Sequence, residues 1–181
     1  MDMAFVFDTE TTGLVENRLR KIERQSEIIE FYGCSVDLDT GTVYGEFETL
    51  IKPQAYPMSK DTIEKTKTML TNEMLADAPH FTNVADEMRK WLEGGPKVIA
   101  HNAAFDREIV DIEMERVGRN VFWPQVVCTI EQTMHMKGFR LSLTNLHKEL
   151  FSEEFVGAHR AKNDVQALVR CCVELRKRGD L

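Results

Sequence analysis

The feature that most constrains this fold is a short apolar run at residues 3–7 that leads directly into acidic residues. Consecutive apolar side chains cover both faces of an extended backbone, so the run predicts a central strand of a sheet with protein packed on both sides. Asp8 and Glu10 follow at positions i and i+2, which places both carboxylates on one side of an extended backbone. A buried strand is therefore expected to deliver two acids to one place.

The remaining hydrophobic pattern predicts an α/β fold. Four further strands are expected, at residues 27–36, 43–51, 97–101 and 126–129. The first two form an antiparallel hairpin through the turn residues 37–41. Helices are expected from the cap Thr82 to Gly94, from the cap Asn102 to Gly118, around residues 143–150, and from about Arg160 to Lys177. This order gives a mixed five-stranded sheet flanked by helices.

Composition places the chain among globular proteins, with 43% hydrophobic and 29% charged residues. The 181 residues contain no repeat or linker-like stretch, so a single domain over residues 1–181 is expected. No stretch approaches the roughly 20 apolar residues that cross a bilayer, and residues 3–7 are too short for a signal peptide. A cytoplasmic protein without membrane contact is expected. The four cysteines form no C-x-x-C pair and predict buried, reduced thiols rather than a zinc site.

The net charge of −7 restricts how this chain can bind nucleic acid. Proteins that bind nucleic acid through bulk electrostatics are usually basic. If DNA or RNA is the substrate, binding has to come from a local site in which metal ions help to neutralise phosphate.

Two more acids lie on the inward-facing stripes of predicted helices, namely Asp106 and Asp164. Converging carboxylates repel one another and resist burial unless a cation joins them. An all-oxygen set selects a hard divalent ion such as Mg²⁺ or Mn²⁺. Each acid taken singly is equally compatible with a helix cap, a salt bridge or a solvated edge. The metal interpretation depends on all four occurring together.

Three segments carry a resemblance to a known family: FDTETTGL at residues 7–14, HNAAFD at residues 101–106 and HRAKND at residues 159–164. In this order they resemble the three motifs of the DnaQ-like DEDDh 3′–5′ exonucleases. That family includes the proofreading exonuclease subunit of bacterial replicative polymerases. The resemblance extends from residue 3 to about residue 175 and implies an RNase H-like fold.

The resemblance also implies a role for each acid in a site for two metal ions. Asp8 would touch both ions. Glu10 and Asp164 would complete the first, which holds the attacking water, and Asp106 would hold the second, through water, on the leaving-group side. His159 would be the general base, on a loop that leaves it free to swing. A lone loop histidine is otherwise most often a solvated surface residue.

The same resemblance implies that Thr11, Thr12, Gly13 and Leu14 receive the terminal nucleotide. Backbone amides of this stretch would bond the 3′-hydroxyl, and Leu14 would wedge against the last base. Gly13 is equally consistent with a simple turn after a strand.

Asn102 and Phe105 are further candidates for substrate contact. Helix capping is the more common role of a residue such as Asn102, and core packing is the more common role of a phenylalanine such as Phe105. The family's frequent His-Gly pair is replaced here by residues 66–70, TKTML, which leaves the contacts to the penultimate nucleotide unassigned.

Basic residues that could contact phosphates occur in two local groups, although a solvated charged loop is the more common explanation for the first. The first group consists of Arg18, Arg20, Lys21 and Arg24. The second consists of Lys137 and Arg140, which flank Phe139. Phe139 could stack on a base or pack in the core.

These observations favour a 3′–5′ exonuclease that acts on single-stranded or frayed DNA ends and releases nucleoside 5′-monophosphates. An RNA exonuclease of the same fold is the alternative. A non-catalytic nucleic-acid-binding module is disfavoured because all four acids and His159 are present. The expected partners are a nucleic-acid 3′ end and either a polymerase or other replication protein or a second copy of this chain.

Overall fold

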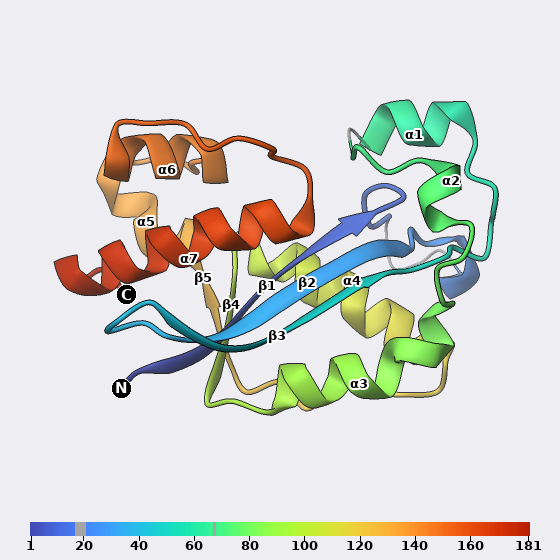
Figure 1. Cartoon of the computed structure of the whole chain (residues 1–181), viewed down its shortest axis with the longest axis horizontal. Helices are drawn as coiled ribbons and strands as arrows, with labels where there is room; N and C mark the ends of the chain where they lie inside the picture. The colour runs from blue at the N-terminus through green and yellow to red at the C-terminus, as the bar shows by residue number, and fades with distance from the viewer. Residues whose placement is uncertain (17–20, 67) are drawn as a thin grey trace.

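The computed structural model describes residues 1–16, 21–66 and 68–181. Its centre is a five-stranded sheet in the order β3-β2-β1-β4-β5 (Figure 1). The strands are β1 (Met3–Thr11), β2 (Ile28–Asp37), β3 (Thr42–Leu50), β4 (Lys97–Ala100) and β5 (Gln125–Cys128). β2 pairs antiparallel with β1 and β3, whereas β4 runs parallel to β1 and to β5. This is the mixed five-stranded sheet that the hydrophobic pattern predicts.

Helices cover both faces of the sheet. They are η1 (Ile22–Arg24), α1 (Lys60–Thr66), α2 (Asn72–Leu75), α3 (Phe81–Glu93), α4 (Ala103–Arg116), α5 (Thr129–Lys137), α6 (Leu143–Phe151) and α7 (Ala161–Arg178). α7 packs on one face of the sheet, and α3 and α4 pack on the other (Figure 1). Among the helices of the described residues, none is long and apolar enough to cross a membrane.

The central strand β1 alternates between these two helical layers. Ala4 and Val6 belong to the core beneath α7, whereas Phe5 and Phe7 belong to the core beneath α3 and α4. Side chains on a strand point alternately to opposite faces. The side chain of Asp8 therefore continues the series that faces α7.

A row of stacked aromatic rings fills the core under α3 and α4. The ring centroids of Phe5 and Phe31 lie 6.5 Å apart, those of Phe7 and Phe31 lie 5.8 Å apart, and Trp91 stacks on Phe5 at 5.8 Å. Gly33 on β2 makes room for this row, because a Cβ there would lie 2.3 Å from the Cζ of Phe5. The row holds β1 and β2 together just before the acids begin.

Some predicted element boundaries need correction. β1 continues to Thr11, so the first acids lie within the strand instead of after it. The predicted cap Thr82 is wrong: the N-cap of α3 is His80, two residues earlier, and the helix begins at Phe81. A bridge between Lys52 and His80 holds the backbone of His80 extended, so the helix starts directly after it.

The predicted cap Asn102 does precede α4. It adopts a left-handed backbone, however, and its side chain makes no capping hydrogen bond.

Helix α5 was not expected from the pattern. Its buried positions are Thr129, Ile130 and Thr133, so two of the three are polar and give no apolar periodicity. Thr133 donates its hydroxyl proton to the carbonyl oxygen of Thr129 at 2.7 Å, which satisfies the buried group within the helix.

Replacing Gly33 by alanine is expected to destabilise the protein by about 1–3 kcal/mol, because the aromatic row leaves no room for the added methyl group. The measurement is the free energy of unfolding in urea. The matched control is Ser35→Ala, two residues along the same strand, which is expected to change that value by less than about 1 kcal/mol. Equal effects of the two substitutions would contradict this account of the packing.

Candidate active site

Three carboxylates from two distant parts of the chain meet beside the sheet. Asp8 and Glu10 come from the same side of β1, and Asp164 comes from the first turn of α7, which packs on that face. Each side chain offers one oxygen atom, and these atoms all lie within 4.8 Å of one another. The carboxylate of Asp164 also lies near the partly positive N-terminus of its helix. The structure thus brings together three of the four predicted acids, and their role as metal ligands stays a prediction.

The fourth predicted acid, Asp106, lies in the first turn of α4 and is 2% exposed. It is not part of the three-carboxylate group. Thr9, on the opposite side of β1 from Asp8, donates its hydroxyl proton to Oδ1 of Asp106 at 2.8 Å. The negative charge of Asp106 nevertheless raises the pKa of Asp8, so the two carboxylates interact. Sequence patterns gave no sign of the contribution of Thr9.

Burial and mutual repulsion both oppose ionisation of these acids. Burial, followed by the charges of the other acids, raises the pKa of Asp8 well above its usual value. The same causes raise the pKa of Glu10 to about 8. Burial raises the pKa of Asp106 to about 7 and that of Asp164 to about 6. A cation would relieve the repulsion, and a set of carboxylate oxygens fits a hard divalent ion.

The backbone of His159 is anchored, whereas its side chain is exposed. The backbone N–H of His159 donates to Oδ2 of Asp164 at 3.0 Å. Asn163 holds the same loop by donating to the carbonyl oxygen of Gly157 at 2.9 Å. These bonds hold the backbone of the loop beside Asp164, and the imidazole of His159 is exposed. The freedom of His159 to swing stays a prediction.

The predicted nucleotide-binding stretch lines a cavity of about 700 Å³. Its walls include Thr11, Thr12, Gly13 and Leu14, together with Glu10 and residues of α1. The Leu14 side chain is 79% exposed there. A cavity of this size holds a small molecule, and it shares the wall residue Glu10 with the carboxylate group. The stretch and the acids are thus neighbours in space.

Side-chain contacts hold this stretch in place. Thr11 donates its hydroxyl proton to the carbonyl oxygen of Gly13 at 2.8 Å. Ser26 donates its hydroxyl proton to the carbonyl oxygen of Leu14 at 2.7 Å, and its Oγ would lie 3.1 Å from a Cβ added at Gly13. This close approach gives a local reason for the glycine beyond a simple turn.

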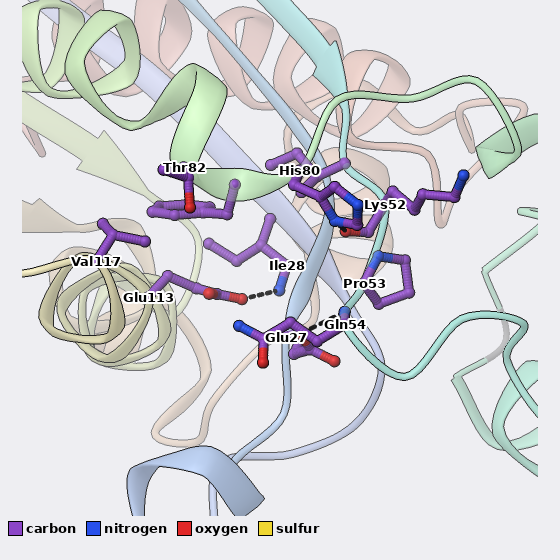
Figure 2. Close-up of a pocket in the computed structure, with 11 residues that line it drawn as sticks. Glu27, Ile28, Lys52, Pro53, Gln54, His80, Thr82, Glu113 and Val117 are labelled. Atoms are coloured by element: carbon purple, nitrogen blue, oxygen red, sulfur yellow. Dashed lines mark hydrogen bonds between the residues drawn. The ribbon is translucent and has the colours of Figure 1, made fainter.

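A smaller cavity of about 130 Å³ lies apart from the four acids, between β2, the end of β3 and α4 (Figure 2). Its buried acid Glu113 accepts a hydrogen bond from the backbone N–H of Ile28 at 2.9 Å and pairs with Arg116 at 3.1 Å. Arg116 in turn donates to the carbonyl oxygens of Ile22, Gln25 and Ser26. This network holds residues 22–28, which follow the predicted nucleotide-binding stretch, against α4.

Three other side chains that were considered for contact with the substrate have defined surroundings in the structure. Oδ1 of Asn102 accepts a hydrogen bond from Nη2 of Arg140 at 2.7 Å. Phe105 packs against the core beneath α3 and α4. Phe139 is 57% exposed, so it does not pack in the core. Substrate contact by Asn102 and Phe105 stays a prediction.

The first basic group and the segment that replaces the His-Gly pair are only partly described. Arg18, Arg20 and Lys67 lie outside the described residues. Lys21 and Arg24 are exposed. Contact of these two side chains with phosphate stays a prediction.

Sequence analysis missed a fifth carboxylate next to the site. Glu30 on β2 pairs in register with Glu10 on β1 and is 1% exposed. Its partner is Arg160, which precedes α7. The available signal was a single acid within the apolar segment IIEFY at residues 28–32, where an unpaired charge is costly.

A family comparison decides which kind of site this is. The exonuclease family model RNase_T matches residues 5–171, a range that contains all three motifs. The chain belongs to this exonuclease family. Members of this family are 3′–5′ exonucleases of the DEDD type that need divalent metal ions, and the group of Asp8, Glu10 and Asp164 could hold such an ion.

Curated relatives of this exonuclease include much longer proteins. The DNA polymerase III PolC-type of Staphylococcus saprophyticus is 30% identical over 174 residues, and that of Staphylococcus aureus (strain bovine RF122 / ET3-1) is 33% identical over 164 residues. The alignments cover 95% and 90% of this chain but only 11% and 10% of the polymerases. The exonuclease thus spans about a tenth of the length of these relatives.

Solved structures of nucleases share the fold of this exonuclease. Exonuclease X in complex with 5′ overhanging duplex DNA aligns with a TM-score of 0.68 at 22% identity, over 97% of this chain and 93% of its own. The nuclease domain of 3′hExo bound to rAMP aligns at 0.77 and 16% identity, over 98% and 93%. The zinc-bound E. coli ExoI–ssDNA complex aligns at 0.78 and 15% identity, over 98% and 41%.

The metal-free exonuclease is expected to lose stability as the pH rises from 6.5 to 8. In this window Asp106, with a pKa of about 7, and Glu10, with a pKa of about 8, lose protons in the folded state. Unfolded carboxyls, with a pKa near 4, are already ionised, so the folded state binds more protons and is favoured at the lower pH. His101, whose pKa burial lowers to about 4, acts in the opposite direction, mainly below pH 6.5 and with a diminishing effect at the lower end of the window.

The measurement is the melting temperature in EDTA, which is expected to fall by about 2–6 °C across the window. Saturating Mg²⁺ should remove this fall in melting temperature, because the bound cation, like the protons, neutralises the charge of the carboxylates. Asp8→Asn removes one of the repelling charges and should flatten the curve in EDTA. An unchanged slope in that variant would show that the acids do not interact as described.

Proposed function

We propose that this exonuclease removes nucleotides one at a time from the 3′ end of DNA, on single strands or frayed ends, with two Mg²⁺ ions for which Mn²⁺ can substitute. The products are nucleoside 5′-monophosphates. The observation that carries the proposal is the meeting of Asp8, Glu10 and Asp164 next to the 700 Å³ cavity, whose wall includes Glu10. Such a cavity beside converging acids offers space for a terminal nucleotide next to bound cations.

Each acid has a place in this proposal. Asp8, Glu10 and Asp164 would hold one ion, and Asp8 and Asp106 would hold the other. When bound, such ions stabilise the charge that develops during displacement at phosphorus. The hydrogen bond from Thr9 keeps one oxygen of Asp106 fixed, which suits contact with an ion through water.

His159 would take the proton from the attacking water. Its exposed side chain belongs to the loop whose backbone is hydrogen-bonded to Asp164, and an imidazole nitrogen can accept a proton from water. The hydrogen bond from its backbone N–H to Asp164 would keep the imidazole close to that proposed ligand. Backbone amides of residues 11–14 would bond the terminal 3′-hydroxyl, and the exposed Leu14 would contact the last base.

DNA as the preferred substrate is supported by the similarity to PolC-type DNA polymerases and by the DNA-bound Exonuclease X structure. The second candidate is an RNA 3′–5′ exonuclease, because 3′hExo, which shares the fold, is bound to rAMP. We further propose a cytoplasmic protein that docks to a polymerase or other replication protein or forms a homo-oligomer. The net charge of −7 supports a need for a binding partner, since the surface of this chain as a whole repels DNA.

Asp8→Asn is expected to lower the rate of nucleotide release by at least about 10³-fold, because both proposed ions lose a ligand. Release is measured on 5′-labelled single-stranded DNA and on RNA of matched sequence, with products separated by chromatography. EDTA should abolish activity, and Mg²⁺ or Mn²⁺ should restore it. The control is Asp39→Asn in the β2–β3 turn, which is expected to keep full activity. Full activity of Asp8→Asn would refute the proposal, and degradation of RNA alone would favour the second candidate.

His159→Gln is expected to lower kcat by about 10²–10⁴-fold through loss of the general base. The same variant should keep the rise in melting temperature that Mg²⁺ produces, because the four acids are unchanged. Loss of that rise, with or without loss of activity, would assign His159 to metal binding instead of proton transfer.

A further inference from the structure

Beside the proposed metal ligands, Glu30 is buried with both of its oxygens engaged. Nε of Arg160 donates to each carboxylate oxygen at 3.1 Å, and Nη2 donates to Oε1 at 2.8 Å. The carboxylate is 1% exposed, and the side chain of Arg160 is 30% exposed. A two-pronged pair of this kind restricts orientation as well as distance. Because these bonds occupy both oxygens, Glu30 is a poor candidate for a metal ligand.

The same carboxylate caps helix α7. The backbone N–H of Ala161, the first residue of the helix, donates to Oε2 of Glu30 at 3.1 Å. Arg160 occupies the N-cap position but makes no capping hydrogen bond with its own side chain. The capping group therefore comes from β2, and it ties the start of α7 to the sheet strand next to β1.

The start of α7 carries two of the proposed functional groups. The backbone N–H of Asp164 donates to the carbonyl oxygen of Arg160 at 3.0 Å, which closes the first helical turn. Oδ2 of Asp164 then accepts the hydrogen bond from the backbone of His159. Arg160, which Glu30 holds, is therefore the residue directly after the proposed base His159. It lies one helical turn before the proposed ligand Asp164.

The charges agree with this geometry. Glu30 adds negative charge to the site and raises the pKa of Glu10, whereas the Arg160 guanidinium lowers it. Arg160 thereby offsets the extra acid without occupying the space between the proposed ligands.

We infer that Glu30 and Arg160 form a positioning pair, which sets where α7 begins and so aligns His159 and Asp164 with the acids on β1. This inference rests on the proposed roles of those two residues. The pair touches neither substrate nor reacting atoms. Its action requires the planar fork of arginine, since a lysine would keep the charge and lose the second parallel bond.

The test compares Arg160→Lys and Arg160→Gln with a control on the same helix, Lys162→Gln. Lys162 also forms an ion pair to a sheet glutamate, Glu48, but both partners of that pair are more than a third exposed. Each variant is assayed for kcat and KM, and its Mg²⁺ affinity is measured separately from the rise in melting temperature during Mg²⁺ titration.

Both Arg160 variants are expected to lower kcat by about 10–100-fold and to weaken Mg²⁺ by about 10-fold, with KM changed less than about threefold. The control is expected to match the unaltered protein. Full kcat and unchanged Mg²⁺ affinity in Arg160→Lys would overturn the inference, because charge alone would then suffice. A lowered melting temperature with unchanged kcat and Mg²⁺ affinity would also overturn it, since the pair would then only stabilise the fold.

If the single variants fail to fold, Glu30→Gln combined with Arg160→Gln removes both buried charges and keeps two groups that can hydrogen-bond to each other. A folded double variant with lowered kcat supports the inference, and one with full kcat overturns it. Failure of the proposed function is recognised separately: Asp8→Asn would then retain activity, whatever the Arg160 variants do.

Discussion

Repulsion among buried carboxylates is the constraint on which the rest of this structure depends. Burial and the charge of neighbouring acids oppose ionisation of Asp8 and Glu10, and burial opposes ionisation of Asp106. Buried acids in such positions cost free energy, and the fold tolerates them only when the rest of the structure stabilises it by more than that cost. Here β1 pairs with β2 on one side and β4 on the other, and its apolar half is buried between two helical layers. The core therefore holds the acids in positions that are favourable when a cation is bound.

Each acid outside β1 is held by a group from a different element. Thr9 fixes Asp106, and the backbone of His159 fixes one oxygen of Asp164. Both aspartates lie in the first turn of a helix, where the aligned backbone N–H groups favour negative charge. With a net charge of −7, the surface as a whole repels a polyanion, so this locally organised site has to provide the attraction. In the proposed function, metal binding and substrate binding are thereby linked.

Most of the fold could be predicted because its elements follow regular apolar periods. The sheet composition, the hairpin of β2 and β3 and the long α7 were all predicted and are confirmed. The predicted cap Thr82 was wrong because pairing of Lys52 with His80 starts α3 earlier. Helix α5 was missed because its buried face contains threonines, whose polar groups are satisfied within the helix. The single-domain prediction remains a prediction.

The sequence by itself determined the chemistry: strand alternation placed Asp8 and Glu10 on one side, and short motifs marked the other candidate residues. Local spacing is sufficient for this because residues within one strand or one helical turn have fixed relative directions. Only the tertiary structure decided what holds these groups in place. Glu30 and Arg160 are 130 residues apart and Thr9 and Asp106 are 97 apart, so no local pattern connects them. Their contacts exist because the sheet and helices bring these segments together.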